Sequence, residues 1–451
     1  MKMEDIVNYS KTYGFIYQGS EIYGGLANTW DYGPLGSRLK NNLKDAWRKR
    51  FIQERLNSYE IDPSILMHPK VWQASGHVDG FSDPLIDCKA CKTRHRADKL
   101  LEENNIEKAE ALSYEEMVDV IREKGIKCPK CNKCDFTDIR EFKLMFETYR
   151  GVTEESKMKI YLRPENAQGE YVNYLNVLRT SRAKLPFSIG QIGKAFRNEI
   201  TPGNFTFRTV EFEQMEFQTF CKEGQDSELY EYFKNYGMKF YTDLGIPKEK
   251  LQFKDHDKLV FYAKAACDIQ YLFPWGFDEI NGTHNRTNYD LTRHEEYSGV
   301  PMRYMDEETK EKFVPYIIES TYGVDRTILA LLFNAYQKEI MENGDEREVL
   351  KIHPFLAPYK VAILPLVKKY HSEKALEIFE KLNKAFMCSY DESGSIGKRY
   401  RRCDAIGTPF VITVDDELEN GIVTLRFRDT MEQIKLNINE VENYVLERIK
   451  F

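Results

Sequence analysis

The segment from Ile189 to Phe220 constrains the fold most, because it reads as two strands joined by a turn. The turn formers Thr201-Pro202-Gly203-Asn204 separate the two runs. Side chains alternate between the two faces of a strand, so residues two apart share a face. On the first strand this predicts that Arg197 and Glu199 share a face. On the second strand the shared face carries Arg208, Val210, Phe212, Gln214 and Glu216.

This second face has an unusual chemistry for a sheet. The cation Arg208, the aromatic ring of Phe212 and the carboxylate of Glu216 follow one another at intervals of four residues. Each interval spans ~13 Å, because a strand rises ~3.3 Å per residue. A guanidinium binds phosphate oxygens, a ring stacks on a flat base, and a carboxylate holds an ammonium group. The pattern therefore fits a substrate with these three parts. The alternative is a solvated sheet face whose charges serve solubility.

Three regions can be separated along the 451 residues. The first runs to about Leu350, and a charge-rich stretch at about 83–140 interrupts it as an insertion. A region of about 95 residues begins near Phe355 and alternates apolar runs with helical stretches, which predicts a small α/β domain. Pro34 is expected to open a helix whose apolar stripe is formed by Leu35, Leu39, Leu43 and Trp47. Periodicity leaves open whether this stripe meets the chain's own core or a second subunit.

Composition excludes several classes of protein. At 42% hydrophobic and 30% charged residues, the chain is globular in type. No apolar run is long enough to span a membrane, and the first fifteen residues lack the apolar segment of a secretory signal. A cytoplasmic location without membrane contact is the expectation. The net charge of −7 gives no general attraction to nucleic acid, so RNA contact must use local basic runs such as 398–402.

Five of the nine cysteines lie between Cys88 and Cys134. Two CxxC pairs present four thiolates, the set that a tetrahedral Zn²⁺ prefers: Cys88, Cys91, Cys128 and Cys131. With four protein ligands such a zinc would be structural, because no position remains open for chemistry. Cys134 could substitute for one of them. The alternative is a set of ordinary reduced thiols.

The segment FRNEITPGNFTFRTVEFEQMEF, residues 196–217, resembles the second signature of the class II aminoacyl-tRNA synthetases in its glycyl-tRNA synthetase form. The stretch from Pro34 to Ile61 resembles the first signature, which forms the dimer interface in that family, and residues 323–330, GVDRTILA, resemble the third. YLRPENAQGEYVNY around Glu165 also matches. The resemblance implies an α+β fold, with an antiparallel catalytic sheet over residues 1–350 and an anticodon-binding α/β domain over residues 355–451.

The resemblance also implies roles in binding ATP and its Mg²⁺. Arg197 would contact the α-phosphate, Arg208 the terminal phosphates, and Phe212 and Arg326 the two faces of adenine. Arg197 and Arg326 would be the catalytic residues. The full implied ATP set is Arg197, Asn198, Glu199, Phe207, Arg208, Thr209, Val210, Glu211, Phe212, Glu279, Ile280, Gly323, Val324, Asp325 and Arg326.

For glycine the implied set is Arg96, Glu165, Phe212, Glu213, Gln214, Met215, Glu216, Glu319, Ser320, Thr321, Tyr322 and Gly323. Glu165 and Glu216 resemble the carboxylates around the ammonium group. The chain reads ESTYG where the family commonly reads EPSAG, and the extra bulk of Tyr322 is expected to exclude larger side chains. Steric exclusion of one methyl group is worth only ~1–3 kcal/mol.

The expected activity is ATP-dependent formation of glycyl-adenylate, followed by transfer of glycine to the 3′ end of its tRNA by a homodimer. Two alternatives remain open at this point. One is a synthetase for another small amino acid. The other is a synthetase-like accessory protein without activity, although such proteins tend to lose the phosphate-binding arginines, whereas Arg197, Arg208 and Arg326 are present here.

Overall fold

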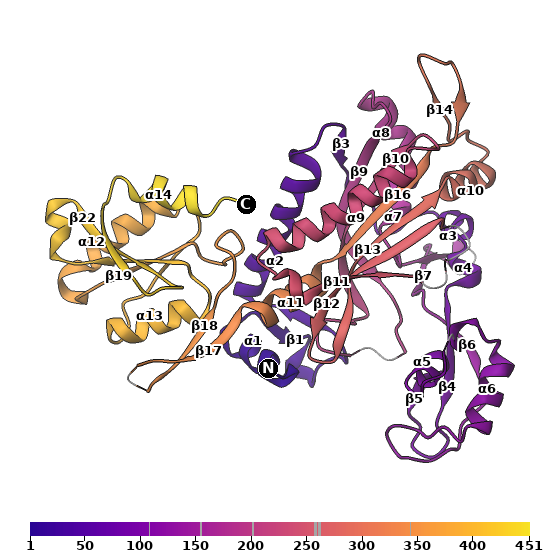
Figure 1. Cartoon of the computed structure of the whole chain (residues 1–451), viewed down its shortest axis with the longest axis horizontal. Helices are drawn as coiled ribbons and strands as arrows, with labels where there is room; N and C mark the ends of the chain where they lie inside the picture. Colours follow the sequence, from indigo (N-terminus) through magenta and orange to yellow (C-terminus); the bar gives the residue numbers. More distant parts are fainter. Residues whose placement is uncertain (108, 154–155, 201–202, 257–258, 260–262, 343) are drawn as a thin grey trace. The chain divides into compact units, whose positions relative to one another are not determined.

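The computed structural model describes residues 1–107, 109–153, 156–200, 203–256, 259, 263–342 and 344–451 (Figure 1). These residues form two compact units. The first unit contains residues 1–59, 224–285 and 318–451, and the second contains residues 60–223 and 286–317. The predicted domain boundary at residues 350–355 lies within the first unit and stays a prediction.

The first unit contains a run of neighbouring strands in the order β11, β12, β13 and β16. Their bounds are Leu251–Asp255, Ala265–Phe273, Gly276–Thr287 and Tyr316–Gly323. The pairings β11–β12 and β12–β13 are antiparallel. The helices of this part of the chain are α1 (Met3–Tyr13), α2 (Pro34–Arg48), α9 (Asp226–Asp243) and α11 (Val324–Ala335). A short hairpin, β1 (Ile16–Gln18) with β2 (Trp30–Tyr32), follows α1.

Helix α2 confirms the predicted start at Pro34, which occupies the first turn. All four residues of the apolar stripe are buried within the single chain, and Leu39, Leu43 and Trp47 have no exposed surface. The stripe therefore belongs to the chain's own core. Lys40 lies outside the stripe and pairs with Asp325 of α11 at 3.0 Å.

The C-terminal part of the first unit is a five-stranded sheet in the order β20, β19, β21, β22, β23. The bounds are Cys388–Tyr390, Val361–Pro365, Phe410–Val414, Ile422–Phe427 and Gln433–Asn437. Helices α12 (Lys368–Leu382) and α14 (Val441–Arg448) pack on the face carrying Val361 and Ile363 (Figure 1). Helix α13 (Ile396–Ala405) packs on the opposite face, against Ala362 and Leu364. Strands and helices thus alternate here as the sequence predicts.

A hairpin of β17 (Tyr336–Ile340) and β18 (Glu346–Leu350) precedes this sheet. It lies directly before the predicted division at residues 350–355, and Arg347 within it is buried. Its Nε lies 2.9 Å from Asp404 of α13, and Arg426 of β22 holds the same carboxylate through two bonds of 2.8 and 2.9 Å. A buried charge persists where it is paired and hydrogen-bonded in this way.

The second unit is built around β9 (Phe187–Phe196) and β10 (Glu211–Cys221), which pair antiparallel from Phe196 opposite Glu211 to Phe187 opposite Phe220. Helices α3 (Pro69–Ala74), α4 (His77–Gly80), α7 (Ala167–Val172), α8 (Tyr174–Thr180) and α10 (Tyr289–Ser298) belong to it. Two hairpins complete it: β7 (Glu147–Arg150) with β8 (Met158–Tyr161), and β14 (Tyr304–Met305) with β15 (Lys312–Phe313).

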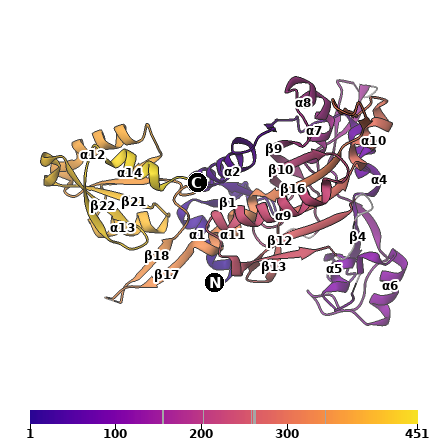
Figure 2. The ribbon, with the colours of Figure 1, turned by 45° about the horizontal axis from the view of Figure 1, so that its top comes forward.

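The predicted insertion forms a small element of its own within this unit. Strands β4 (Ser82–Asp87), β5 (Arg94–Arg96) and β6 (Arg140–Lys143) pair antiparallel. Helices α5 (Ala97–Glu102) and α6 (Tyr114–Glu123) lie beside them (Figure 2). Ile86, Leu101 and Ile121 share its apolar core.

The strand pair within 189–220 is confirmed, but the two strands end further from the turn than the sequence predicts. Fourteen residues, 197–210, connect β9 to β10, so Arg197, Glu199 and Arg208 follow or precede the strands instead of lying on them. The predicted turn residues Thr201 and Pro202 lie outside the described residues. Backbone bonds hold the connection in place: Arg197 N donates to Val210 O at 2.9 Å, and Asn198 N donates to Leu144 O at 2.8 Å.

Candidate functional site

Arg197 and Phe212 of the second unit lie side by side. The sequence predicts them to be a phosphate-binding cation and a ring that stacks on adenine. The Arg197 Nε donates to the Pro164 carbonyl at 3.0 Å. Its guanidinium lies 5.3 Å from the centre of the Phe212 ring and 5.2 Å from that of Phe81. The hydrogen bond fixes one donor of the Arg197 guanidinium, and the two aromatic rings restrict the orientation of its plane. This arrangement pre-orients a cation that can bind phosphate oxygens.

The connection after Arg197 carries the second predicted phosphate ligand. Arg208 pairs with Glu199 at 3.8 Å, and its side chain remains 31% exposed. Phe207 and Thr209 are buried on either side of it, which fixes the backbone at Arg208. A bridge between Gly203 and Arg208 closes the connection. Phe207 and Thr209 therefore support Arg208, and the charged side chain faces outward.

Strand alternation divides the predicted glycine residues on β10. Phe212, Gln214 and Glu216 share one face, whereas Glu213 and Met215 share the other. Met215 is fully buried in the core. The Gln214 Oε1 accepts from the Asn166 backbone at 3.2 Å. The five consecutive residues 212–216 therefore cannot all meet one ligand through their side chains.

The carboxylates Glu165 and Glu216 are each held by buried polar neighbours. Glu216 is 1% exposed and accepts from Gln218 Nε2 at 3.2 Å, and Gln218 in turn accepts from Tyr171 at 2.9 Å. Glu165 accepts from Gln168 Nε2 at 3.0 Å and lies 3.4 Å from His77.

This polar network continues into α10 through residues that sequence reasoning missed. Gln168 also donates to Asp290 at 3.2 Å, and Arg286 grips Asp290 with two bonds of 2.8 and 3.0 Å. Arg286 is 4% exposed and lies over the Tyr171 ring at 5.6 Å. Its i, i+4 spacing to Asp290 in RTNYD is a signal for such a pair. Nothing in the sequence links that pair to Gln168.

Arg96 lies at the end of β5 between two carboxylates. Its Nη2 is 2.6 Å from Asp98 and its Nη1 is 3.3 Å from Asp83. Burial opposes the charge of Arg96, yet the hydrogen bond to Asp98 and both carboxylates leave its pKa raised. Burial raises the pKa of Asp83, and the charge of Glu199 adds to this. Arg96 is therefore a fixed cation in the electrostatic range of Glu199.

The predicted residues of the first unit form their own group. Arg326 pairs with the Glu279 carboxylate at 2.9 Å and donates to its backbone carbonyl at 3.1 Å. Glu319 accepts from His284 Nδ1 at 2.7 Å, and the Thr321 carbonyl accepts from Asn281 at 2.8 Å.

Other predicted residues of this unit lie in its core or join its elements to one another. Ile280 and Val324 are buried in the core, and Gly323 precedes α11 as its N-cap. Asp325 accepts from Tyr32 at 2.7 Å and from Lys40 at 3.0 Å. Its carboxylate therefore ties the start of α11 to β2 and α2.

Tyr322, whose bulk is expected to exclude larger side chains, lies on the core face of β16. It has no exposed surface, and its ring packs against Phe51, Phe240 and Tyr241 at centroid distances of 5.0–6.0 Å. Ser320 is also fully buried and shares its face of β16, whereas Glu319 and Thr321 lie on the other face. Strand alternation thus turns the bulk of Tyr322 into the core, and its expected effect on larger substrates stays a prediction.

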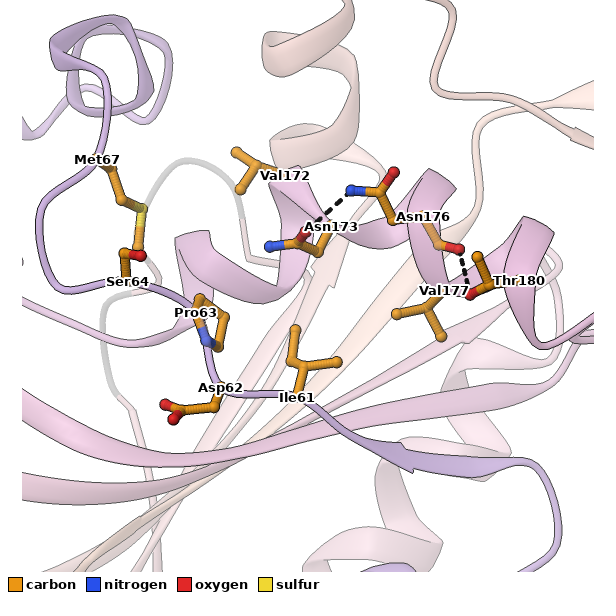
Figure 3. Close-up of a pocket in the computed structure, with 10 residues that line it drawn as sticks. All are labelled: Ile61, Asp62, Pro63, Ser64, Met67, Val172, Asn173, Asn176, Val177 and Thr180. Atoms are coloured by element: carbon orange, nitrogen blue, oxygen red, sulfur yellow. Dashed lines mark hydrogen bonds between the residues drawn. The ribbon is translucent and has the colours of Figure 1, made fainter.

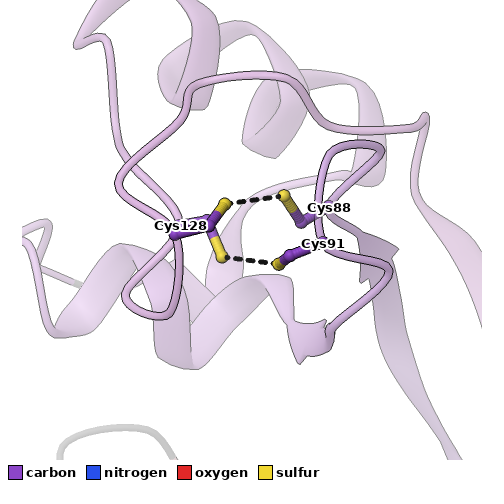
Figure 4. Close-up of side chains that lie close together, drawn as sticks. Cys88, Cys91 and Cys128 are labelled. Carbon is purple, nitrogen blue, oxygen red and sulfur yellow. Dashed lines mark hydrogen bonds between the residues drawn. The ribbon is translucent and has the colours of Figure 1, made fainter.

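The four predicted zinc ligands lie together in the insertion. Figure 4 shows three of them, Cys88, Cys91 and Cys128. Their sulfurs lie within 4.8 Å of one another, with Cys88–Cys131 at 3.5 Å and Cys91–Cys128 at 3.6 Å. Both pairs have the same backbone: Lys92 N donates to Cys88 O and Asn132 N to Cys128 O, each at 2.8 Å, and both donors have positive φ. Sulfurs bound to zinc at ~2.3 Å in a tetrahedron lie ~3.8 Å apart, so the cluster fits that ion.

A surface groove of about 510 Å³ opens elsewhere on the second unit (Figure 3). It lies between the segment from Ile61 to Met67 and helices α7 and α8. Asn176 bridges to Asn173 at 3.0 Å along its helical side. None of its lining residues belongs to the predicted substrate sets, so the sequence gives it no role.

Comparison with known proteins identifies the family. Residues 142–335 match the tRNA synthetase class II core domain (G, H, P, S and T), and residues 360–448 match the anticodon binding domain. A glycine–tRNA ligase of Clostridium acetobutylicum is 56% identical, covering 99% of both chains. Those of Clostridium tetani and Acetivibrio thermocellus are 54% and 55% identical, covering 100% of this chain and 99% of their own.

These matches confirm the predicted α+β class II fold with an anticodon-binding domain. Among the described residues, no helix combines the length and apolar character that a bilayer crossing needs. The chain belongs to the glycine–tRNA ligases, a family of class II aminoacyl-tRNA synthetases.

Proposed function

We propose that the chain joins glycine to the 3′ end of tRNA(Gly), through glycyl-adenylate formed from ATP. The observation that carries this is the Arg197 guanidinium, held by the Pro164 carbonyl beside the Phe212 ring. The glycine carboxylate is itself the nucleophile on the α-phosphorus, so no general base is required. A fixed guanidinium stabilises the charge that develops on phosphate oxygens as pyrophosphate leaves.

Positioning accounts for the rest of the activation step. Arg208 binds the outer phosphates, and Arg326 contributes to nucleotide binding from the start of α11. ATP is bound with Mg²⁺, which neutralises phosphate charge when present; the carboxylate of Glu279 is a suitable hard ligand and is 45% exposed. Glu165 and Glu216 hold the glycine ammonium, and their buried hydrogen-bond partners fix both carboxylates. Two carboxylates at the α-carbon also disfavour an apolar substituent there.

An amino-acid-dependent pyrophosphate exchange assay tests the substrate. Glycine is expected to support ATP–pyrophosphate exchange, and alanine, serine and proline are expected to remain near the background measured without amino acid. The expected discrimination against alanine is at least ~10-fold, since excluding one methyl group is worth ~1–3 kcal/mol. Exchange with serine, alanine or proline but not glycine would instead establish a synthetase for another small amino acid.

For the four cysteines, we propose one structural Zn²⁺ per chain. Support comes from the two matching CxxC turns and from the sulfur separations of 3.5 and 3.6 Å. Metal analysis of purified protein should give about one zinc per chain, and Cys128→Ser should lose most of it, because three ligands and a weak hydroxyl replace four thiolates. Cys134 is exposed, and its sulfur contacts Gly125 O at 3.3 Å, so Cys134→Ser is the matched control and should retain the metal. Zinc far below one atom per wild-type chain would refute the site.

The anticodon-binding part would meet tRNA(Gly) through the basic residues of α13. We also propose a homodimer, as the first signature implies, and action in the cytoplasm, where tRNA and ATP are available. Light scattering of the full chain should then give about twice the chain mass of 53.1 kDa. A mass of one chain at assay concentrations would contradict the dimer.

A further inference from the structure

Three potential metal ligands, none of them in a predicted residue set, gather at β11, β12 and β13 of the first unit. His256 follows β11, Asp268 lies on β12, and His284 lies on β13. One donor atom of each lies within 4.8 Å of the others, and His256 Nε2 is 2.9 Å from Asp268 Oδ1. The two imidazole rings are 5.7 Å apart and nearly perpendicular. Donor atoms at these separations can converge on one ion.

The orientation of His284 is fixed by Glu319. Its Nδ1 lies 2.7 Å from the Glu319 Oε2, and a carboxylate can only accept, so Nδ1 carries the hydrogen. In the neutral ring the lone pair is then on Nε2. A carboxylate behind the far nitrogen is the usual support of a metal-binding histidine, because it sets the tautomer and raises the basicity of the ligand.

Gly282 lies beside these donors and has no side chain to crowd them. It pairs with Asp268 across the β12–β13 ladder. A Cβ placed on Gly282 would lie 3.2 Å from His284 Cε1 and 3.6 Å from both Asp268 Oδ1 and His284 Nε2, so both donor atoms lie beside the bare backbone of Gly282. The His256 backbone N donates to Ala266 O at 3.0 Å, which holds the third ligand beside the ladder.

We propose that His256, Asp268 and His284 bind a divalent transition-metal ion of the Zn²⁺ or Co²⁺ type. Two imidazoles and one carboxylate favour such ions over Mg²⁺ or Ca²⁺, which prefer oxygen ligands. Three protein ligands leave a fourth position for water. The side chains are 34%, 15% and 24% exposed, so an ion can reach them from solvent. The ion would tie the segment after β11 to β12 and β13.

Cobalt(II) distinguishes this site from the cysteine cluster. Full-length protein that carries one zinc per chain, in the cysteine cluster alone, is titrated with Co²⁺, and uptake is measured by equilibrium dialysis and visible absorption. One further Co²⁺ per chain should bind, with weak visible bands and no thiolate-to-metal charge-transfer band, because no sulfur is a ligand. His256→Gln and Asp268→Asn should each weaken this uptake at least tenfold. His68→Gln, which changes an exposed histidine outside the cluster, is the matched control.

The cysteine cluster is common to wild type and variants, so a difference between them reports the histidine site alone. Co²⁺ should also raise the thermal unfolding temperature of wild type and leave that of Asp268→Asn unchanged, since an ion that binds only the folded chain stabilises it. Equal cobalt uptake by wild type and both variants would overturn the proposal. Uptake that always carries a thiolate band would overturn it as well, by assigning all the metal to cysteine.

Discussion

Arg197→Ala is expected to lower glycine-dependent pyrophosphate exchange by about 10²–10³-fold, the usual effect of removing one donor that stabilises transition-state charge. The wild-type guanidinium is fixed by the Pro164 carbonyl and two rings, so its orientation is set before substrate arrives. The loss should appear mainly in kcat, because the interaction strengthens as charge develops on the phosphate.

Two further variants make this result specific. Arg197→Lys keeps the charge but loses the planar fork, so it should recover only part of the rate. Arg179→Ala removes an exposed arginine of α8 in the same unit and should retain wild-type exchange. If wild type and Arg197→Ala showed the same background rate, the chain would instead be an accessory protein that kept the fold and lost the activity.

Tyr322→Ala should destabilise the chain by about 3–5 kcal/mol, the range for removing a buried aromatic ring. Its ring is fully buried among three other aromatic side chains. The packing is close: a Cβ on Gly237 of α9 would lie 3.0 Å from the Tyr322 hydroxyl, so the helix approaches the sheet through a glycine. Denaturant unfolding measures the loss.

The same variant tests whether Tyr322 sets specificity. Because the ring points away from Thr321, folded Tyr322→Ala protein should prefer glycine over alanine as wild type does. Tyr322→Phe, which keeps the ring, should cost less than about 1.5 kcal/mol. Tyr370→Ala removes a tyrosine that is 67% exposed and should change stability by less than about 0.5 kcal/mol. Improved use of alanine by Tyr322→Ala would place the side chain in the pocket after all.

Helices and strands were predictable where apolar and polar residues repeat with one clear spacing along the chain. The alternation from Ile189 to Phe220 gave both strands, and the four-residue spacing after Pro34 gave α2. Local patterns do not predict the path of the connection 197–210, because it depends on residues distant in sequence, including the Leu144 carbonyl that accepts from Asn198 N. Alternation on β16, by contrast, is a local pattern, and it places Tyr322 and Thr321 on opposite faces of the strand.

The polar surroundings of the site could not be predicted from one sequence. Gln168 and Asp290 are 122 positions apart, and only the folded chain brings them to 3.2 Å. The family resemblance implies Glu165 and Glu216. Their hydrogen-bond partners Gln168 and Gln218 are common residue types that follow no local sequence pattern. The cysteine cluster was predictable because each pair of ligands has the short CxxC spacing, which is visible in the sequence.

The Arg347–Asp404–Arg426 cluster has a consequence for dividing the chain into fragments. A C-terminal fragment beginning at Phe355 would lack Arg347 and leave Asp404 with one of its two arginine partners. A fragment beginning at Tyr336 would retain the whole hairpin. It would still expose the Ala405 carbonyl and the Glu348 carboxylate, which receive the hydroxyls of Tyr9 and Tyr13 from α1. Helix α1 thus supplies hydrogen bonds to the C-terminal part of the first unit, so a stable fragment of that part requires replacing these contacts as well as choosing where to cut the chain.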